Sequence, residues 1–507
     1  MILLLDFGSQ TAHLIARRVR ELGQDVQIVL PDVAIAKIKE HKPDGIIFSG
    51  GPASVYAVGA PLVDKEIFKL GIPILGICYG VQLSAYLAGG EVKPGVKKEF
   101  GPATFTKTHD TPLLEGLPEE FPIWMNHGDQ VVRPPEGAIT VGKSETIDVA
   151  AFADDTNKHY GIQFHPEVVH TPLGKEIFRN FVEKVCGLEI KPAILPSIDE
   201  LVTDIKKQIG SGKAVLALSG GVDSSTAALL VHKAIGDNLT CIYVDTGMMR
   251  KGETEQVNEI FKEHFHMNVK TVYAEEEFLK NLKGITDPEA KRKIIGKTFI
   301  EIFEREAKSL GGVQYLVQGT IYPDVIESAG TTHSANIKSH HNVGGLPEKH
   351  GFKIIEPLRY YYKDEVRRLA KELNLPDSVI KRHVFPGPGL AVRIIGDVTK
   401  EKLDILREAD AIVTEELRSA GLYESLWMGF AILAGVKTTG QTGDERRYGE
   451  LIAIRAVTSV DAMTAEWAHL PYEVLGKMSS RIVNEVHQVS RVVYDITTKP
   501  PATMEWE

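Results

Sequence analysis

Short apolar runs alternate with amphipathic stretches from the first residues of the chain. Residues 2–5, 26–30 and 45–48 are apolar or nearly so, whereas residues 12–22 and 31–40 carry apolar side chains at helical spacing. Strands that alternate with helices at this interval are typical of a doubly wound α/β domain with a parallel sheet. Such sheets bind ligands beyond the carboxyl ends of their strands, so the loops at those ends are where we expect chemistry.

The alternation stops near residues 187–196 and then begins again. Pro192 and Pro196 interrupt the periodicity there and predict an extended linker. A predicted helix over residues 197–209 leads into predicted strands at 214–218, 240–244 and 315–317. This second series predicts a second doubly wound α/β domain.

Beyond residue 386 the pattern changes to strands mixed with two long helices. Strand-like segments lie at residues 391–395, 450–456 and 491–496, and the helical patterns cover 400–417 and 478–489. This arrangement predicts a small α+β domain. Because 507 residues are too many for one compact core, we predict three domains, over residues 1–187, 196–385 and 386–507.

The composition narrows the class of protein. Hydrophobic residues make up 43% of the chain and charged residues 25%, as in an ordinary globular enzyme, and the formal charge of −10 disfavours a protein that coats nucleic acid. The three cysteines form neither a disulfide framework nor a metal-ligand pattern. The apolar N-terminal run ends after five residues, and no stretch is long enough to span a bilayer, so we predict a cytoplasmic protein without a membrane partner.

The stretch after residues 214–218 is the strongest chemical signal. Its two glycines permit a sharp turn and a close approach to an anion, which the first N–H groups of the next helix and the serine hydroxyls would meet. The alternative is that the Asp and Ser side chains only cap that helix. We predict a phosphate site made of seven residues: Ser219, Gly220, Gly221, Val222, Asp223, Ser224 and Ser225.

A second candidate lies where an earlier apolar strand ends. Cys78 stands in a Gly-x-Cys-x-Gly pattern, the form of a nucleophile elbow with cysteine in place of serine. A lone cysteine after a strand is more often a buried structural residue. However, His165 and Glu167 stand two positions apart near the end of another strand, where their side chains can share a face. Together they predict a triad of thiolate, proton carrier and orienting carboxylate.

Two further stretches carry charged side chains. Asp324 and Glu327, followed by Lys338 in a Gly- and Pro-rich segment, have the composition of a lid over a reaction centre. The neighbouring pair of adjacent histidines makes a poor zinc site, and we predict no metal ligands. The basic run around Arg292 is either a solvated helix face or an anion site.

Residues 1–187 resemble the class I glutamine amidotransferases, and the loop 219–225 resembles the pyrophosphate loop of the ATP pyrophosphatases. By this resemblance Cys78, His165 and Glu167 hydrolyse glutamine, and the backbone N–H groups of Gly51 and Tyr79 form the oxyanion hole.

The whole chain resembles the glutamine-hydrolysing GMP synthetase family. The resemblance is carried by residues 319–328, 338–347, 385–390 and 499–507, and the chain departs from it at 441–442. It implies that XMP, ATP and glutamine give GMP, AMP, pyrophosphate and glutamate, with Mg²⁺ on the ATP phosphates and a homodimer formed by the third domain. It also implies site roles for two sets of residues: Asp324, Glu327 and Lys338 over the adenylyl intermediate, and Arg292, Lys499 and Glu505 at XMP.

Two other functions share part of this pattern. A different amide-forming ATP pyrophosphatase, similar to NAD synthetase or to a tRNA-modifying enzyme, would have the same loop but not the ending at residues 499–507. A non-enzymatic sensor of glutamine or nucleotide would need at least one damaged site, whereas both sets of residues are complete in this chain.

Overall fold

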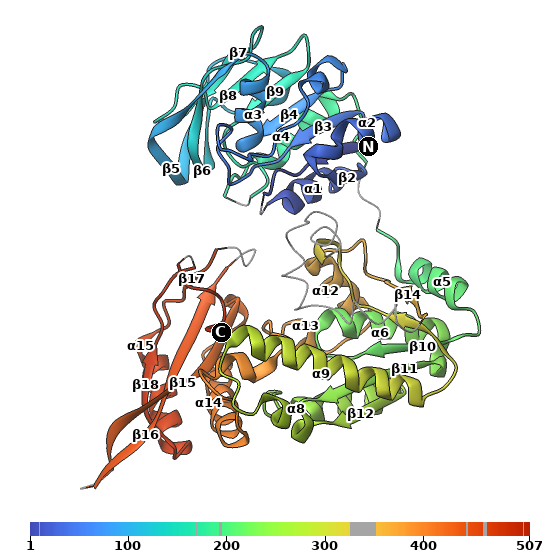
Figure 1. Cartoon of the computed structure of the whole chain (residues 1–507), viewed down its shortest axis with the longest axis vertical. Coiled ribbons are helices and arrows are strands. Elements are labelled where there is room, and N and C mark those ends of the chain that lie inside the picture. The colour runs from blue at the N-terminus through green and yellow to red at the C-terminus, as the bar shows by residue number, and fades with distance from the viewer. Residues whose placement is uncertain are drawn as a thin grey trace. The chain divides into compact units, whose positions relative to one another are not determined.

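The computed structural model describes residues 1–507 except 10, 169, 192–194, 325–350, 443–444, 460–463 and 500, and for residues 96–100, 442 and 445 it describes the backbone alone. The described residues form two compact units (Figure 1). Unit 1 covers Met1–Leu195, and unit 2 holds the described residues from Pro196 onward. The three domain boundaries read from the sequence stay predictions.

Unit 1 is built on one mixed sheet of nine strands. Five of them are parallel: β2 (Val26–Val29), β1 (Ile2–Leu5), β3 (Gly45–Phe48), β4 (Ile74–Ile77) and β9 (His159–Ile162). An antiparallel extension continues the sheet through β8 (Ala151–Asp154), β7 (Ile139–Lys143), β5 (Glu91–Lys107) and β6 (Glu120–Arg133). The predicted α/β class is confirmed, and the extension is an addition that the strand pattern did not predict.

The helices of unit 1 bury their apolar stripes against this sheet. Helix α1 (Ala12–Arg20) buries Ile15, Ala16 and Val19, which recur at helical spacing. The remaining α-helices described in this unit are α2 (Ala34–His41), α3 (Tyr79–Leu87) and α4 (Gly174–Asn180). Strands β1, β3 and β4 are completely buried, which explains their unbroken apolar sequences.

The first sheet of unit 2 is parallel throughout, with the order β12-β11-β10-β13-β14. Its strands are β10 (Lys213–Ala217), β11 (Leu239–Asp245), β12 (Val269–Tyr273), β13 (Val313–Val317) and β14 (Lys353–Ile355). The helices around it are α5 (Ile198–Ile209), α6 (Val222–Ile235), α7 (Glu253–Val257), α8 (Glu275–Leu282), α9 (Pro288–Ser309), α12 (Lys363–Glu372) and α13 (Asp377–Ile380). This confirms the second predicted α/β sheet.

The second sheet of unit 2 is mixed and lies against two helices (Figure 1). Strands β15 (Met428–Thr442) and β16 (Glu445–Thr458) form a long antiparallel pair, with β17 (Glu466–Trp467) antiparallel and β18 (Val489–Tyr494) parallel to β16. Helices α14 (Lys400–Ser419) and α15 (Tyr472–Glu485) pack on these strands. One buried apolar cluster runs from β10 and β11 through α9 to α14 and β16, so the two sheets share a core.

The strand predicted at residues 391–395 is wrong. Gly389–Arg393 forms a 3₁₀ helix, and only Ile394 makes a bridge, to Leu433. Gly389 has φ +64°, and a Cβ there would lie 2.4 Å from the Met248 carbonyl oxygen, so only glycine suits this position. The next residue, Leu390, donates its N–H to that same oxygen at 2.8 Å. No helix among the described residues is long and apolar enough to cross a membrane.

Candidate active site

Cys78 stands on a strained turn between a buried strand and a helix. It follows β4, precedes α3 and has φ 52° and ψ −108°, an unusual conformation for a residue other than glycine. The packing around Gly76 and Gly80 explains why the motif has glycine at both positions. A Cβ at Gly76 would lie 2.6 Å from the Gly80 oxygen, and one at Gly80 would lie 2.5 Å from the Phe48 oxygen. The motif is therefore required for close packing of the strand against the helix.

His165 and Glu167 form a buried pair, as predicted. The His165 Nδ1 lies 2.7 Å from Glu167 Oε1, and Glu167 has no exposed surface. Burial opposes a charge on His165, but the Glu167 carboxylate and the Cys78 sulfur raise the pKa of the imidazole well above its usual range. Burial raises the pKa of Glu167, but His165 and hydrogen bonds that include the one from Thr11 together outweigh it, so the pKa is lowered. The carboxylate therefore accepts a hydrogen bond from the Nδ1–H group, which leaves Nε2 for proton transfer.

The structure brings Cys78 close to this pair. A Cβ at Gly50 would lie 3.3 Å from His165 Cε1 and 3.6 Å from Cys78 Cβ, so the two side chains flank the same glycine. The Cys78 Sγ is 3.5 Å from the carbonyl oxygen of Asn126. His165 Nε2 is buried and has no hydrogen-bond partner among the described residues. An unpaired buried nitrogen beside a thiol can act as its base.

The two predicted oxyanion donors lie next to Cys78. Tyr79 is the first residue of α3, where a helix leaves its N–H groups without intrahelical partners. A Cβ at Gly51 would lie 2.7 Å from the Phe7 oxygen and 3.3 Å from the Tyr79 ring, so this backbone packs directly on Tyr79. The Tyr79 hydroxyl donates to the Pro61 oxygen at 2.7 Å, and burial raises the pKa of Tyr79 to about 12. Its side chain is thus structural, and its backbone N–H follows directly on Cys78 at the helix N-terminus.

Two residues around the triad were not identified from the sequence. Thr11 donates to Glu167 Oε1 at 2.6 Å, and Arg18 Nε donates to the Glu167 backbone oxygen at 3.2 Å. Both come from the region of α1, about 150 positions away, and no sequence motif links that helix to Glu167.

The other two cysteines, Cys186 and Cys241, have pKa values raised by burial to about 12, which suits structural thiols.

The predicted phosphate loop joins β10 to α6. Gly220 has φ +73° and Gly221 is the N-cap of the helix, so the turn needs the glycine that the sequence supplies. Ser219 Oγ and Ser224 Oγ lie 2.9 Å apart and close the loop. Ser225 Oγ is buried and has no hydrogen-bond partner among the described residues. The helix N-terminus and the unsatisfied hydroxyl suit an anionic ligand.

Charged residues outside the motif hold this loop. Lys363, the first residue of α12, forms an ion pair with Asp223 Oδ2, while Asp223 Oδ1 is buried without a partner among the described residues. Arg382 donates from Nη1 to the Gly220 oxygen at 3.3 Å and pairs with Glu253. Neither cation was identified from the sequence, because each reaches the loop from a segment more than 100 positions away.

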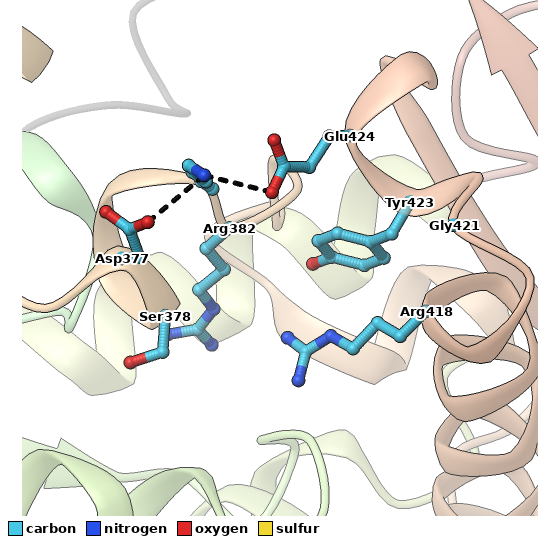
Figure 2. A pocket seen from close by; sticks show the side chains of 8 residues that line it. Asp377, Ser378, Arg382, Arg418, Gly421, Tyr423 and Glu424 are labelled. Atoms are coloured by element: carbon cyan, nitrogen blue, oxygen red, sulfur yellow. Dashed lines mark hydrogen bonds and ion pairs between the residues drawn. The ribbon is translucent and has the colours of Figure 1, made fainter.

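A cavity of about 450 Å³ lies beside Arg382. Figure 2 shows the lining side chains of Arg382 and Arg418, which come from two different segments, and the Tyr423 ring beside Arg418, whose Cζ lies 4.7 Å from the ring centroid. Lys381 at its rim bonds to both Asp377 and Glu424 at 3.0 Å. The lining lysine is thus already neutralised by internal ion pairs, and the cavity matches no predicted site.

The predicted lid is described only at its first residue. Asp324 Oδ2 accepts from the Ile321 N–H at 2.9 Å. Glu327 and Lys338 lie outside the described residues. Gly319, at the start of this segment, packs on the phosphate loop, since a Cβ there would lie 3.1 Å from the Ser224 nitrogen.

Two of the three predicted XMP residues, Arg292 and Glu505, contact or belong to the segment at residues 505–507. Glu505 forms a two-pronged ion pair with the buried Arg393, at 3.0 and 2.9 Å, and Arg292 donates to the Glu507 backbone oxygen. The backbone of Lys499 pairs with that of Ala465. The structure therefore brings Arg292 and Glu505 to one segment.

The basic run around Arg292 is not simply a solvated face. Lys291 is fully buried, where it pairs with Glu507 and donates to the Ile394 oxygen at 2.7 Å. Lys293 is exposed. No group of three or more His, Cys, Asp or Glu side chains is arranged as a metal cage within the described part of the chain.

Three family models match the chain. Residues 3–185 match the class I glutamine amidotransferase model, 194–294 match the NAD synthase model and 415–506 match the GMP synthase C terminal domain model. The three matches follow one another along the chain in the order amidotransferase, ATP-using domain and C-terminal domain.

Curated relatives match over the full length. The glutamine-hydrolysing GMP synthase of Carboxydothermus hydrogenoformans is 55% identical over 506 residues, covering 100% of this chain and 99% of the relative. Those of Clostridium perfringens and Aquifex aeolicus are each 52% identical with the same coverage. Among solved structures, a proposed GMP synthase component of Thermoplasma acidophilum is 36% identical with a TM-score of 0.31, covering 37% of this chain and 93% of its own.

Proposed function

The chain belongs to the glutamine-hydrolysing GMP synthase family, and on this premise we propose how its residues divide the reaction. It is a ligase that makes GMP with glutamine as the nitrogen donor and ATP as the energy source. This assignment rests mainly on one observation. The chain holds a strained cysteine beside a buried His–Glu pair in unit 1, and it holds a phosphate loop in unit 2.

Glutamine hydrolysis is assigned to Cys78, His165 and Glu167. His165 Nε2 takes the thiol proton, the sulfur attacks the amide carbon, and the same proton goes to the departing ammonia. Glu167 accepts the hydrogen bond of the Nδ1–H group and stabilises the imidazolium, which the raised pKa of His165 supports. The N–H groups of Gly51 and Tyr79 stabilise the tetrahedral oxyanion. Water then cleaves the thioester and releases glutamate.

The synthetase half-reaction is assigned to unit 2. The 2-oxygen of XMP attacks the α-phosphorus of ATP and pyrophosphate leaves. Ammonia then attacks C2, and AMP leaves with the former 2-oxygen. The loop from Ser219 to Ser225 holds the pyrophosphate through its N–H groups and hydroxyls, which the unpaired Ser225 Oγ supports. Asp324, Glu327 and Lys338 close over the adenylyl intermediate and exclude water.

Mg²⁺ is the metal ion proposed to accompany ATP. Asp223 Oδ1 is buried without a partner among the described residues and lies in the phosphate loop, so a hard oxygen donor is present where the ion is needed. Mg²⁺ bound to phosphates keeps several waters and needs only one or two protein carboxylates. When bound, the ion neutralises charge on the phosphate oxygens. Asp223 would hold it, with Lys363 on the other carboxylate oxygen.

Arg292, Lys499 and Glu505 are proposed to fix XMP, with the two cations toward its phosphate. This proposal is supported by the position of two of these residues. Arg292 donates to the backbone oxygen of Glu507, and Glu505 lies in the same segment, 505–507. XMP, ATP and glutamine are accordingly the proposed small-molecule substrates.

We further propose a cytoplasmic homodimer. Exposed aromatic and aliphatic side chains on and beside the second sheet of unit 2 support an interface between two copies there: Val436, Tyr448, Tyr472, Val493 and Ile496. The need for a free thiol at Cys78 supports a reducing compartment.

The decisive experiment measures AMP release from ATP with XMP or deamido-NAD as acceptor and with glutamine or ammonium as nitrogen source. Wild type should release AMP only with XMP. Cys78→Ala should lose glutamine-dependent synthesis and retain the ammonium-dependent reaction, because unit 2 is unchanged. Cys186→Ala serves as the matched control, since Cys186 is a structural thiol of the same unit and should retain both activities.

Each assignment has its own contrary outcome. AMP release that requires deamido-NAD would contradict the XMP assignment and favour an NAD synthase activity, whose model matches residues 194–294. Glutamine use by Cys78→Ala would contradict the triad.

A further inference from the structure

The loop that follows β1 reaches the triad carboxylate. Thr11 Oγ1 lies 2.6 Å from Glu167 Oε1, and His165 Nδ1 lies 2.7 Å from the same oxygen. The other oxygen, Oε2, is buried and has no hydrogen-bond partner among the described residues. One oxygen of this carboxylate therefore takes both contacts, and one of them comes from a residue 156 positions earlier in the chain.

The directions of the hydrogen bonds follow from which groups can donate. An ionised carboxylate only accepts, so the Thr11 hydroxyl gives its one proton to Glu167. The Ser9 hydroxyl, 3.0 Å away, must then donate to Thr11 Oγ1, while the Thr11 N–H donates to Ser9 Oγ at 3.1 Å. Two hydrogen bonds in sequence thus run from the Ser9 hydroxyl through the Thr11 hydroxyl to Glu167. A separate hydrogen bond reaches Glu167 from His165.

The same loop is anchored near the oxyanion donors. Asp6 Oδ1 accepts from the N–H groups of Gly8 and Ser9, each at 3.0 Å. The Phe7 N–H donates at 3.0 Å to the hydroxyl of Ser49, two residues before Gly51. Ser9, the residue that contacts Thr11 through its hydroxyl, is therefore itself held by Asp6, so the position of Thr11 does not depend on Glu167 alone.

We propose that Thr11 is a positioning residue for glutamine hydrolysis. The terminal torsion of a glutamate side chain is broad, so one hydrogen bond from His165 does not fix the plane of the carboxylate. The hydroxyl of Thr11, bonded to the same oxygen, holds the carboxylate in the orientation that His165 needs. This inference rests on the proposed role of the triad.

The test compares Thr11→Val with Thr11→Ser in the full-length chain. Valine keeps the volume of threonine and removes the donor. We expect kcat for glutamine hydrolysis to fall about tenfold, as for loss of a hydrogen bond to a charged group, with KM for glutamine within about twofold. Serine restores the hydroxyl and should recover most of the kcat. Ammonium-dependent AMP release should stay at the wild-type rate in both variants, which reports that unit 2 is folded.

Thr111→Val is the matched control. Thr111 Oγ1 also donates to a carboxylate in unit 1, Asp155 Oδ1 at 2.8 Å, and the second donor to this oxygen is the Tyr160 hydroxyl, which is not a triad residue. Its removal should leave kcat unchanged. Iodoacetamide alkylation of Cys78 gives a second readout, because the thiolate is the reactive form and a misoriented His165 removes the thiol proton less readily. The alkylation rate should fall in Thr11→Val and stay unchanged in Thr11→Ser and Thr111→Val.

The outcomes separate this inference from the proposed function. Wild-type kcat in Thr11→Val, with Cys78→Ala inactive toward glutamine, would overturn the role of Thr11 and leave the triad standing. Equal losses in Thr11→Val and Thr11→Ser would also overturn it, since the hydroxyl would not be the group that matters. Glutamine hydrolysis by Cys78→Ala would remove the triad and this inference with it.

Discussion

Cys78 adopts a backbone conformation that costs a non-glycine residue about 1–3 kcal/mol. The surrounding glycines permit the close packing of this turn, because a side chain at Gly76 or Gly80 would collide with neighbouring backbone. The strain presents the sulfur at the head of α3, beside an imidazole whose pKa is raised by Glu167. At the residue scale, the site is thus a reactive group held by tight backbone packing.

Replacement of Gly51 by alanine tests the oxyanion hole. The new Cβ would lie 2.7 Å from the Phe7 oxygen, so the backbone must shift and the N–H donor moves with it. Loss of one such donor costs about 100-fold or more in kcat, and we expect this loss in the glutaminase assay with ammonium-dependent synthesis retained. Gly59→Ala, on a loop of the same unit with φ +81° and open space around it, is the control for backbone strain without a collision. A Gly51→Ala enzyme with normal glutaminase activity would argue against this donor.

The buried His159 is expected to make the stability of unit 1 sensitive to acid. Burial lowers its pKa from 6.5 to about 4, opposed by Asp154 nearby. The unfolded chain therefore binds this proton more tightly than the folded chain, so stability is lost as pH falls from about 6.5 to about 4. Because each unit of pKa difference between the folded and unfolded chain changes the free energy of unfolding by about 1.4 kcal/mol, the full loss is about 3 kcal/mol.

The measurement is urea unfolding of unit 1 between pH 7 and pH 4 in wild type and His159→Phe. Phenylalanine suits the aromatic surroundings, where Phe68 and Phe152 lie 4.9 and 5.4 Å from the imidazole, and it cannot titrate. The variant should have a flatter pH dependence. Identical slopes for the two proteins would show that His159 is not the sensitive group.

At the scale of elements, the turn from β10 to α6 resembles the turn from β4 to α3. Each is a parallel strand that ends at a tight loop and continues into a helix whose N-terminus faces the ligand side. The first loop carries a nucleophile and the second carries glycines and hydroxyls for phosphate. One local geometry thus serves two kinds of chemistry, and the side chains at the turn decide which.

Replacement of Gly220 by alanine should separate the two half-reactions. Its φ of +73° and a Cβ at 2.9 Å from Val257 make alanine strained there, so the phosphate loop must shift. We expect ATP-dependent AMP release to fall about 100-fold or more while glutaminase activity remains, since a shift of about 1 Å at a positioning element costs that much.

Gly236→Ala is the matched control for backbone strain. Gly236 ends the same helix with φ +55° and has open space around it. It should lower stability by about 1 kcal/mol and retain AMP release. Equal losses of AMP release in both variants would mean that helix stability, and not loop geometry, limits the reaction.

At the scale of the whole molecule, the last residues of the chain connect elements of unit 2 that are remote in sequence. Arg455 is fully buried and donates to the backbone oxygens of Thr503 and Met504. Glu507 pairs with the buried Lys291 at the start of α9. These contacts join the second sheet to the helix beside the first one, in agreement with the core that the two sheets share.

Lys291→Met should destabilise unit 2 by about 3–5 kcal/mol. The change leaves the Glu507 carboxylate, which is 5% exposed, without its cation, and an unpaired buried charge costs about that much. Urea unfolding of unit 2 measures the effect. The double variant with Glu507→Gln should recover part of the loss.

Lys293→Met, two residues away and exposed, should cost less than about 0.5 kcal/mol. A Lys291→Met protein as stable as the Lys293→Met protein would contradict the buried ion pair.

The sequence by itself determined the local features of this protein. The apolar runs and helical stripes predicted both α/β sheets, because burial on two faces requires continuous apolar strands. The glycine motifs predicted the turns at Cys78 and at Ser219–Ser225, because positive φ and close backbone contact are local requirements of the chain. The predicted strand at 391–395 failed where a tertiary contact, Gly389 on Met248, overrode the apolar pattern.

Only the tertiary structure decided which remote side chains complete each site. The contacts of Thr11 with Glu167, of Lys363 with Asp223 and of Lys291 with Glu507 join residues 156, 140 and 216 positions apart. Nothing in the local periodicity encodes such pairs, because hydrophobic patterning specifies which face of an element is buried and leaves its partner open. The partner is selected when the elements pack and each buried charge must find an opposite charge or a hydrogen bond.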